Sequence, residues 1–196
     1  MERYGEGKPI NIIYASNDGY ACHLGASLYS LLDNNRNIPK LEIYVLSVGM
    51  SRNFENRLKA IGARFGRQVH MAEMGELRDR FPYEVDTRGF DISAMARLFA
   101  PEVLPASVDR ALYLDCDTIV RGGIRGLYQT DLKGNLAGMV MEPTVYEKMR
   151  ERIGLKKDEP YFNSGVILMD LEAWRREGTL KALLDFYRER GGNLFA

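Results

Sequence analysis

The sequence is poor in cysteine, in histidine and in long apolar runs. Its 196 residues include two cysteines and two histidines, too few for a fold built on disulfides, and they show no zinc-ligand spacing. No apolar run approaches the roughly 18 residues that span a bilayer, and the N-terminal residues lack the apolar core of a signal peptide. We therefore expect a cytoplasmic protein without a transmembrane segment.

The charge has no excess of either sign. Lys and Arg together number 27, as do Asp and Glu, so the formal net charge is zero. A nucleic-acid-binding surface is therefore not expected. Hydrophobic residues make up 45% and charged residues 28%, which excludes a disordered or low-complexity chain. The length fits a single domain covering residues 1–196.

Short β-branched runs alternate with amphipathic segments along the chain. This alternation predicts an α/β fold, with a mostly parallel central sheet flanked by helices. Residues 75–91 are polar and predict a surface loop, whereas Met139 and Met141 are expected in the core. Strands are predicted at residues 10–15, 41–48, 68–72, 110–115, 136–141 and 165–169, and helices at residues 20–33, 51–62, 171–190 and in a segment capped by Ser93.

A D-x-D sequence, Asp115-Cys116-Asp117, follows the fourth predicted strand. Ligands of open α/β sheets bind beyond the C-terminal ends of the strands. Residues two apart on an extended chain point to the same side, so the two carboxylates could share Mg²⁺ or Mn²⁺. The alternative is a solvated acidic turn that caps the next segment.

A strand–turn–helix junction follows the first predicted strand and contains Ala15, Ser16, Asn17, Asp18 and Tyr20. Such a junction directs free backbone N–H groups at whatever lies above the sheet. Asn17 offers an amide carbonyl and Tyr20 a stacking face, which together suit a pyrimidine base. The alternative is an ordinary helix cap, with Tyr20 packed in the core.

Two further polar features stand out. Arg97 lies between apolar neighbours, so its side chain either extends past them to water or contacts an anion. Asn163, Ser164 and Gly165 precede the last predicted strand and could line a sugar site. The alternative for these three residues is a simple turn that enters the strand.

Together these segments resemble the family-8 glycosyltransferases, a retaining group with the GT-A nucleotide-diphospho-sugar transferase fold. The group includes bacterial lipopolysaccharide glucosyl- and galactosyltransferases and glycogenin. The resemblance extends from about Ile10 to Arg190. Its most specific stretches are residues 93–98, 104–105, 108–120, 161–166 and 170–175.

The resemblance implies transfer of a hexose from UDP-glucose or UDP-galactose to a glycan or lipid-linked acceptor. Asp115 and Asp117 would hold Mn²⁺ or Mg²⁺ against the diphosphate, Tyr20 would stack on uracil, and Arg97 would contact the donor. The nucleotide-binding residues would be Ala15, Ser16, Asn17, Asp18, Tyr20, Arg97, Asp115, Cys116 and Asp117. Those near the donor sugar or acceptor would be Glu142, Asn163, Ser164 and Gly165. The resemblance does not determine the oligomeric state, so assembly into a homo-oligomer stays an open alternative.

The sequence departs from the family pattern in the junction after the first strand and at its end. Gly19 stands where relatives often carry asparagine. Asn17 stands where relatives commonly carry aspartate, although its carbonyl can still accept a hydrogen bond from uracil N3–H. Family members also continue with a D-Q-D segment and a later histidine and lysine, which are not found here. We therefore expect the catalytic groups beyond Ala196 and weak or no turnover by this chain itself. A full-length form could lie at the inner membrane as a peripheral protein.

Two alternatives to a transferase stay open. The chain could be a truncated, non-catalytic module that binds a nucleotide sugar. It could also be a phosphatase of the haloacid-dehalogenase type, in which the first Asp of D-x-D is the nucleophile. That motif requires Thr or Val four residues after the first Asp, and Ile119 occupies this position.

Overall fold

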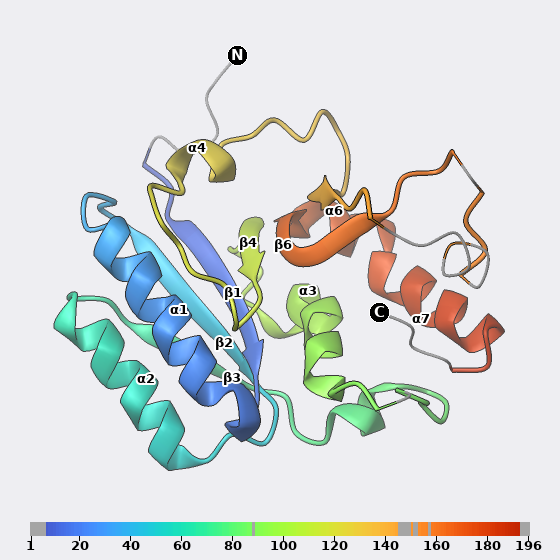
Figure 1. Ribbon diagram of the computed structural model, residues 1–196, viewed down its shortest axis with the longest axis horizontal. Helices are drawn as coiled ribbons and strands as arrows, with labels where there is room; N and C mark the ends of the chain where they lie inside the picture. The colour runs from blue at the N-terminus through green and yellow to red at the C-terminus, as the bar shows by residue number, and fades with distance from the viewer. Residues whose placement is uncertain (1–6, 88, 145–149, 151–152, 157, 193–196) are drawn as a thin grey trace.

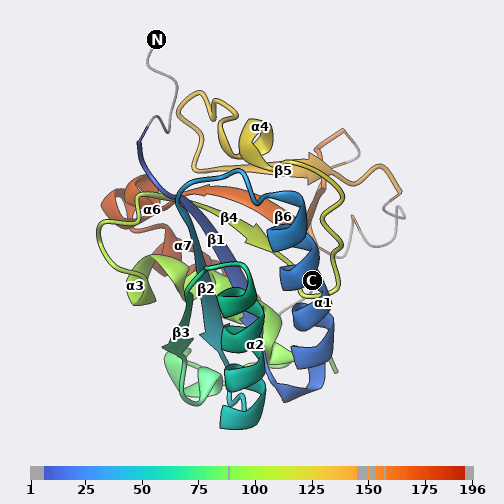
Figure 2. The ribbon, with the colours of Figure 1, turned by 90° about the vertical axis from the view of Figure 1, so that its left-hand side faces the viewer.

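The computed structural model describes residues 7–87, 89–144, 150, 153–156 and 158–192 (Figure 1). Within them, a six-stranded sheet is covered by helices on both faces (Figure 2). The strands are β1 (Ile10–Ser16), β2 (Leu41–Ser47), β3 (Val69–Glu73), β4 (Arg110–Leu114), β5 (Ala137–Met141) and β6 (Phe162–Asp170). The α-helices are α1 (Ala21–Asn34), α2 (Arg52–Arg64), α3 (Ala100–Val103), α4 (Arg125–Tyr128), α6 (Leu171–Glu177) and α7 (Thr179–Glu189). The 3₁₀ helices are η1 (Asp18–Tyr20), η2 (Leu77–Arg80) and η3 (Ile92–Phe99).

The strand order is β3-β2-β1-β4-β6-β5. Strands β3, β2, β1 and β4 are parallel to one another, whereas β6 runs antiparallel to β4 and to β5. The prediction of an α/β fold with a mostly parallel sheet is therefore confirmed. Because the four parallel strands are adjacent, their C-terminal ends share one edge, where ligands of such sheets bind.

Residues of β1 alternate between two apolar cores. Ile12 and Tyr14 lie in the core formed with α1 and α2, whereas Ile13 and Ala15 lie in the core formed with η3, α3, α6 and α7. All seven residues of β1 are buried. A central strand covered on both faces requires a largely apolar sequence, and β1 departs from it only at Asn11 and Ser16.

Polar side chains of α1 fix the path of the chain after β4. The backbone N–H of Val120 donates to Ser30 Oγ at 2.9 Å, and Asn34 Nδ2 donates to the Val120 carbonyl at 3.0 Å. Asn35, the residue that follows α1, makes a similar contact: its Oδ1 accepts a hydrogen bond from the Ile124 N–H at 2.9 Å. The segment that carries the D-x-D sequence is thus tied to a helix formed almost a hundred residues earlier.

The segment from residue 92 to 103 differs from the predicted helix. Ser93 is not its cap, because Asp91 Oδ1 accepts a hydrogen bond from the Ser93 N–H at 2.9 Å. Residues 92–99 form a 3₁₀ helix, and α3 begins only at Ala100. Pro101 has no N–H to donate to the carbonyl of Arg97, which an α-helix through this point would require.

Two predictions about burial were wrong. Met139 and Met141 are 40% and 59% exposed rather than in the core, because β5 is an edge strand of the sheet. Residues 75–91 are not simply a surface loop, because Leu77, Phe81 and Val85 are buried against η3 and its neighbours.

The C-terminal segment forms two helices rather than the one predicted. Gly178 separates α6 from α7 with a φ of 65°, the left-handed conformation that glycine adopts without steric cost. Both cysteines are free thiols, with Cys22 exposed and Cys116 buried. Over the residues that the structure describes, none of the helices combines the length and the apolar character needed to cross a bilayer.

Candidate nucleotide-binding site

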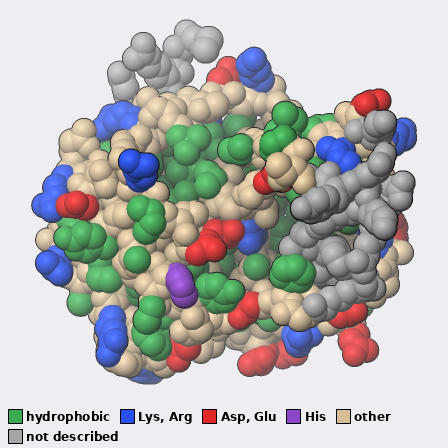
Figure 3. All heavy atoms as spheres, in the orientation of Figure 1, with side chains coloured by type: hydrophobic (Ala, Val, Ile, Leu, Met, Phe, Trp, Pro, Cys, Tyr) green, Lys and Arg blue, Asp and Glu red, His purple; other side chains and the backbone are tan. Residues whose placement is uncertain are grey.

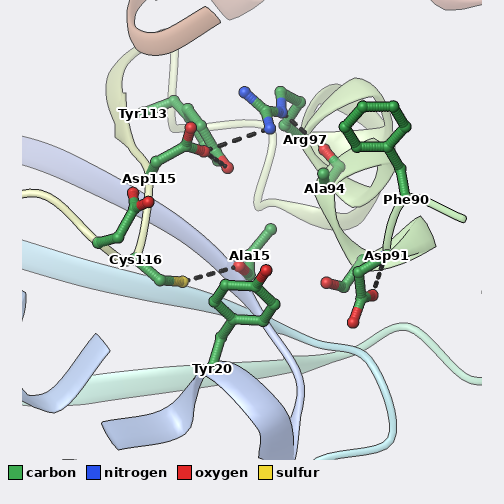
Figure 4. Close-up of a pocket in the computed structure, with 11 residues that line it drawn as sticks. Ala15, Tyr20, Phe90, Asp91, Ala94, Arg97, Tyr113, Asp115 and Cys116 are labelled. Atoms are coloured by element: carbon green, nitrogen blue, oxygen red, sulfur yellow. Dashed lines mark hydrogen bonds and ion pairs between the residues drawn. The ribbon is translucent and has the colours of Figure 1, made fainter. Parts of the chain in front are cut away.

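A pocket of about 310 Å³ opens beyond the C-terminal ends of β1 and β4. The chain leaves β1 toward β2 on one side and reaches β4 on the other, so the pocket lies at the switch point where α/β sheets bind ligands. On the face of the molecule that Figure 3 shows, acidic side chains lie beside a basic one near the middle. The lining residues are Ala15, Tyr20, Phe90, Asp91, Ser93, Ala94, Arg97, Tyr113, Asp115, Cys116 and Asp117 (Figure 4).

The carboxylate of Asp115 is held from two sides. Its Oδ1 accepts a hydrogen bond from Tyr113 Oη at 2.6 Å and faces Arg97 Nη2 at 3.2 Å. Its backbone N–H donates to the Gly165 carbonyl of β6 at 2.8 Å. These contacts fix Oδ1, and they leave Oδ2 as the atom available to a cation.

Gly165 makes room for this second oxygen. A Cβ at residue 165 would come within 3.0 Å of Asp115 Oδ2 and 3.1 Å of Asn163 Oδ1. Both distances are shorter than ordinary carbon–oxygen contacts. The lack of a side chain on β6 therefore forms a cradle for the Asp115 carboxylate.

Arg97 spans the upper end of the pocket in Figure 4. Its Nε donates to the Ala94 carbonyl at 2.6 Å, its Nη1 donates to the Ser164 carbonyl, and its guanidinium carbon lies 4.4 Å from the centre of the Tyr113 ring. The side chain does not extend to water. Of the two alternatives for Arg97, extension to water was wrong: its guanidinium pairs with the Asp115 carboxylate, and its contact with a bound anion stays a prediction.

The D-x-D sequence forms a turn rather than a continuation of the strand. β4 ends at Leu114, and the Thr118 N–H donates to the Asp115 carbonyl at 3.2 Å. The argument from extended-chain geometry was therefore wrong, although Asp115 and Asp117 both line the pocket. The turn, and not strand alternation, brings the two carboxylates to one side.

Cys116 closes the floor of the pocket between the two strands. Its Sγ donates to the Ala15 carbonyl of β1 at 3.0 Å. Burial raises the pKa of the Cys116 thiol to about 11. The thiol is thus protonated at neutral pH and serves as a hydrogen-bond donor instead of a nucleophile.

The junction after β1 contains both the cap and an exposed aromatic ring. Asn17 Oδ1 accepts a hydrogen bond from the Tyr20 N–H at 3.2 Å, so the capping alternative for Asn17 is confirmed. Tyr20 is 43% exposed and lines the pocket, so the alternative of a core aromatic was wrong. The ring is available as a stacking surface.

The other polar residues of this junction face elsewhere. Ser16 is buried, and its hydroxyl donates to the Asn17 carbonyl at 3.1 Å. Asp18 Oδ1 accepts from the Ser51 N–H at 2.6 Å, at the start of α2. Ser16, Asn17 and Asp18 are therefore not among the residues that line the pocket.

Sequence reasoning missed Asp91. Its carboxylate caps η3 and accepts a hydrogen bond from Asn17 Nδ2 at 2.6 Å. Burial acts to raise the pKa of Asp91, but hydrogen bonds from the Ser93 N–H and from Asn17 outweigh it and lower that pKa. The signal for a cap was an aspartate two residues before Ser93. Nothing in the sequence pairs that aspartate with Asn17, 74 residues away.

The residues expected near the sugar lie beside the pocket rather than in its wall. Asn163, Ser164 and Gly165 are part of β6, so the alternative of a turn before the strand was wrong. Ser164 and Gly165 reach the pocket through their contacts with Arg97 and Asp115. Glu142 accepts a hydrogen bond from the Thr144 N–H at 3.1 Å, and its bonds to Thr144 lower its pKa.

The donor set at the D-x-D turn fits a hard divalent cation. Asp115 Oδ2 and the Asp117 carboxylate are oxygen donors on one pocket wall, and Gly165 keeps the space beside Oδ2 free of a side chain. Mg²⁺ and Mn²⁺ are commonly held by one or two carboxylates together with substrate phosphates. In the described ranges, no group of three or more His, Cys, Asp or Glu residues gathers at a site of this kind.

The chain is similar to known proteins in sequence and in fold. The model of the family described as "Glycosyl transferase family 8" matches residues 11–195. General stress protein A of Bacillus subtilis is 26% identical over 181 residues, which cover 92% of this chain and 62% of the relative. Lipopolysaccharide 1,2-glucosyltransferase of Escherichia coli K12 is 29% identical over 178 residues, which cover 84% of this chain and 48% of the relative. The chain thus spans about half to two-thirds of the length of these two curated relatives.

Solved structures show the same fold. The galactosyltransferase LgtC, crystallised with donor and acceptor sugar analogs, superposes with a TM-score of 0.80 at 26% sequence identity. The match covers 95% of this chain and 67% of LgtC. The expected GT-A fold is confirmed.

Proposed function

The chain belongs to glycosyl transferase family 8, and from this premise we propose that its pocket binds a UDP-hexose together with Mn²⁺ or Mg²⁺. The observation that carries the proposal is the meeting of an exposed aromatic ring, a guanidinium group and two carboxylates at the switch point of the sheet. The reaction we propose is transfer of the hexose to a glycan or lipid-linked acceptor with retention. Because the chain belongs to this family, the alternative of a haloacid-dehalogenase-type phosphatase is dropped.

The charges of the pocket support a requirement for a cation. Asp91, Asp115 and Asp117 are acidic, and Arg97 is the basic residue among those that line it. Arg97 is already paired with Asp115. A diphosphate would therefore meet excess negative charge, and a divalent cation bound with it supplies the compensating positive charge and electrostatic stabilisation of the departing UDP.

The residues of this chain have distinct roles in the proposed complex. Tyr20 stacks on the base at one end of the pocket. Asp115 and Asp117 face the diphosphate, with Tyr113 and Arg97 holding the Asp115 carboxylate in place. Fixing these groups in advance reduces the reorganisation needed when charge develops on the leaving diphosphate.

The hexose is proposed to lie toward β6. Gly165 touches the Asp115 carboxylate, so the strand is adjacent to the place where the diphosphate would end. Asn163, Ser164 and Glu142 provide polar atoms on that side. Glucose and galactose are the candidate hexoses, because the E. coli relative is named a glucosyltransferase and LgtC a galactosyltransferase.

Calorimetry with UDP tests the binding part of the proposal. We expect Mn²⁺ to strengthen UDP binding, and Asp117→Asn to remove that gain because it replaces a charged oxygen ligand by a neutral amide. Asp131→Asn is the matched control, since Asp131 lies before β5 and an asparagine carbonyl can keep its bond to the Lys133 N–H. UDP affinity that is independent of metal would contradict the proposal.

A second candidate is a binding module without turnover. It is favoured by the lining of the pocket, whose polar groups suit a base, a diphosphate and a cation. Release of UDP from UDP-glucose or UDP-galactose, followed with Mn²⁺ and acceptor present, separates the two candidates. Binding of UDP without its release from either donor would favour the binding module. Rates in the usual enzyme range of about 1–1000 per second would favour the transferase.

A further inference from the structure

The pocket carries a carboxylate near its exposed aromatic ring. Tyr20 and Asp91 lie toward the lower end of the pocket in Figure 4, and Arg97 and Tyr113 toward its upper end. If Tyr20 stacks on a base, the polar group at the same end of the pocket can contact the edge of that base. Asp91 is in this position.

Asn17 is poorly placed for the same contact. Its Oδ1 accepts from the Tyr20 N–H at 3.2 Å, and its Nδ2 donates to Asp91 Oδ2 at 2.6 Å. Asn17 is also not among the residues that line the pocket. Its amide is therefore used within the protein, and it orients the carboxylate of Asp91.

Asp91 has acceptor capacity left over. Its Oδ1 accepts from the Ser93 N–H at 2.9 Å, and its Oδ2 accepts from Asn17. The Ser93 side chain also hydrogen-bonds to this carboxylate, and because each carboxylate oxygen has two lone pairs, room for one further hydrogen bond is left. The lowered pKa of Asp91 keeps the group charged at neutral pH, and hydrogen bonds to a charged acceptor are stronger than those between neutral groups.

We propose that Asp91, and not Asn17, reads the base by accepting the imide N–H of uracil. The inference rests on the proposed function and assigns its base specificity to a residue of η3's cap. The same negative charge disfavours the diphosphate at this end of the pocket, whereas a divalent cation held at the D-x-D turn would attract it to the other end.

The test compares UDP, N3-methyl-UDP and 2′-deoxy-UDP, each with Mn²⁺, on the unaltered chain and on Asp91→Asn. The unaltered chain should bind UDP about ten- to hundredfold more tightly than N3-methyl-UDP, the range for a hydrogen bond to a charged group. Asp91→Asn should lose most of the affinity for UDP and change the affinity for N3-methyl-UDP little. The affinity for 2′-deoxy-UDP should fall as it does for UDP.

The double variant Asn17→Asp, Asp91→Asn separates the effect of the charged oxygen on UDP binding from its effect on the stability of the fold. It restores a carboxylate–amide hydrogen bond between the two segments, so the melting temperature should stay close to that of the unaltered chain. UDP affinity should remain low, because the charged oxygen then belongs to a residue that does not line the pocket. Recovery of UDP affinity in this double variant would overturn the inference.

The other outcomes distinguish this inference from the proposed function. Equal losses for UDP and N3-methyl-UDP in Asp91→Asn would show that Asp91 is only structural. A loss that disappears with 2′-deoxy-UDP would assign the carboxylate to the ribose. Either result overturns the inference and leaves the proposed function standing, whereas failure of the unaltered chain to bind UDP at all would overturn both.

Discussion

The hydroxyl oxygens of Ser27 and Thr118 lie 3.0 Å apart and link α1 to the turn that carries the D-x-D sequence. Thr118 Oγ1 donates to the Asp115 carbonyl at 2.8 Å, which uses its one hydrogen. Ser27 therefore donates to Thr118 and accepts from Tyr14 Oη, which is 3.0 Å away. This chain of hydroxyl groups is buried at Tyr14 and Ser27 and half-buried at Thr118, and it fixes the backbone carbonyl of Asp115.

Thr118→Val tests that chain of hydrogen bonds. Valine has nearly the same shape but leaves Ser27 without its acceptor and the Asp115 carbonyl without one donor. The free energy of unfolding should fall by about 1–3 kcal/mol, the cost of an unsatisfied buried polar group. Chemical denaturation measures this. Thr130→Val is the control, since Thr130 is exposed and donates only a long 3.4 Å bond to the Gly126 carbonyl. Equal stability of both variants would contradict the role of Thr118.

Gly165→Ala should affect the metal-dependent step more than the fold. The new Cβ would lie 3.0 Å from Asp115 Oδ2, so the carboxylate must move by a few tenths of an ångström. We expect UDP affinity in the presence of Mn²⁺ to fall about three- to tenfold, which is roughly 0.7–1.4 kcal/mol. Gly126→Ala is the control because a Cβ there meets nothing within 4 Å. Unchanged affinity in Gly165→Ala would show that Oδ2 is not used.

The two cysteines should react at different rates with a maleimide at pH 8. Cys22 is exposed, whereas Cys116 is buried, bonded to the Ala15 carbonyl and protonated because burial raises its pKa to about 11. Mass spectrometry should therefore find one label on the folded protein and two after unfolding. Rapid labelling of Cys116 in the folded state would mean that the floor of the pocket opens.

The raised pKa of Glu73 predicts that the stability of the fold depends on pH. Although Glu73 is exposed at the end of β3, partial desolvation, followed by the neighbouring carboxyl of Glu55, raises its pKa above the ordinary value of 4.5. The folded state therefore favours the protonated form. The stabilising contribution is present below about pH 4.5 and is lost as the pH rises through the raised pKa.

Glu73→Gln should accordingly raise the melting temperature at pH 7 and change it little at pH 4. Thermal unfolding at both values measures the difference. Glu76→Gln, at an exposed residue before η2, is the control and should show no such change between the two pH values. A stabilisation by Glu73→Gln that is equal at pH 4 and pH 7 would contradict the assignment.

The sequence predicted those parts of the site that lie next to a strand end. Tyr20, Asp115 and Asp117 follow β1 and β4 directly, and the parallel arrangement brings these ends together. Tyr113 was missed, although a residue two before Asp115 on the same side of the chain is the expected neighbour of its carboxylate. Asp91 could not be found in this way, because its contact with Asn17 depends on how η3 packs against β1.

The errors about exposure have a different cause. Hydrophobic residues predict a strand, but they do not reveal where the strand lies in the sheet. β6 inserts between β4 and β5, which leaves β5 at the edge with Met139 and Met141 exposed. Sheet order depends on long-range pairing, which local sequence patterns do not encode.

The position of β6 also orders events during synthesis on the ribosome. β6 is the last to be made of the six strands that the structure describes, yet it supplies the Gly165 carbonyl to the Asp115 N–H and the Ser164 carbonyl to Arg97. Gly165 follows Asp115 by 50 residues, which take about 3–10 s to translate at roughly 5–20 residues per second. During that interval the nascent chain has Asp115 and Arg97 without the two β6 carbonyls that hold them, so these residues are fixed in place only after β6 has left the exit tunnel.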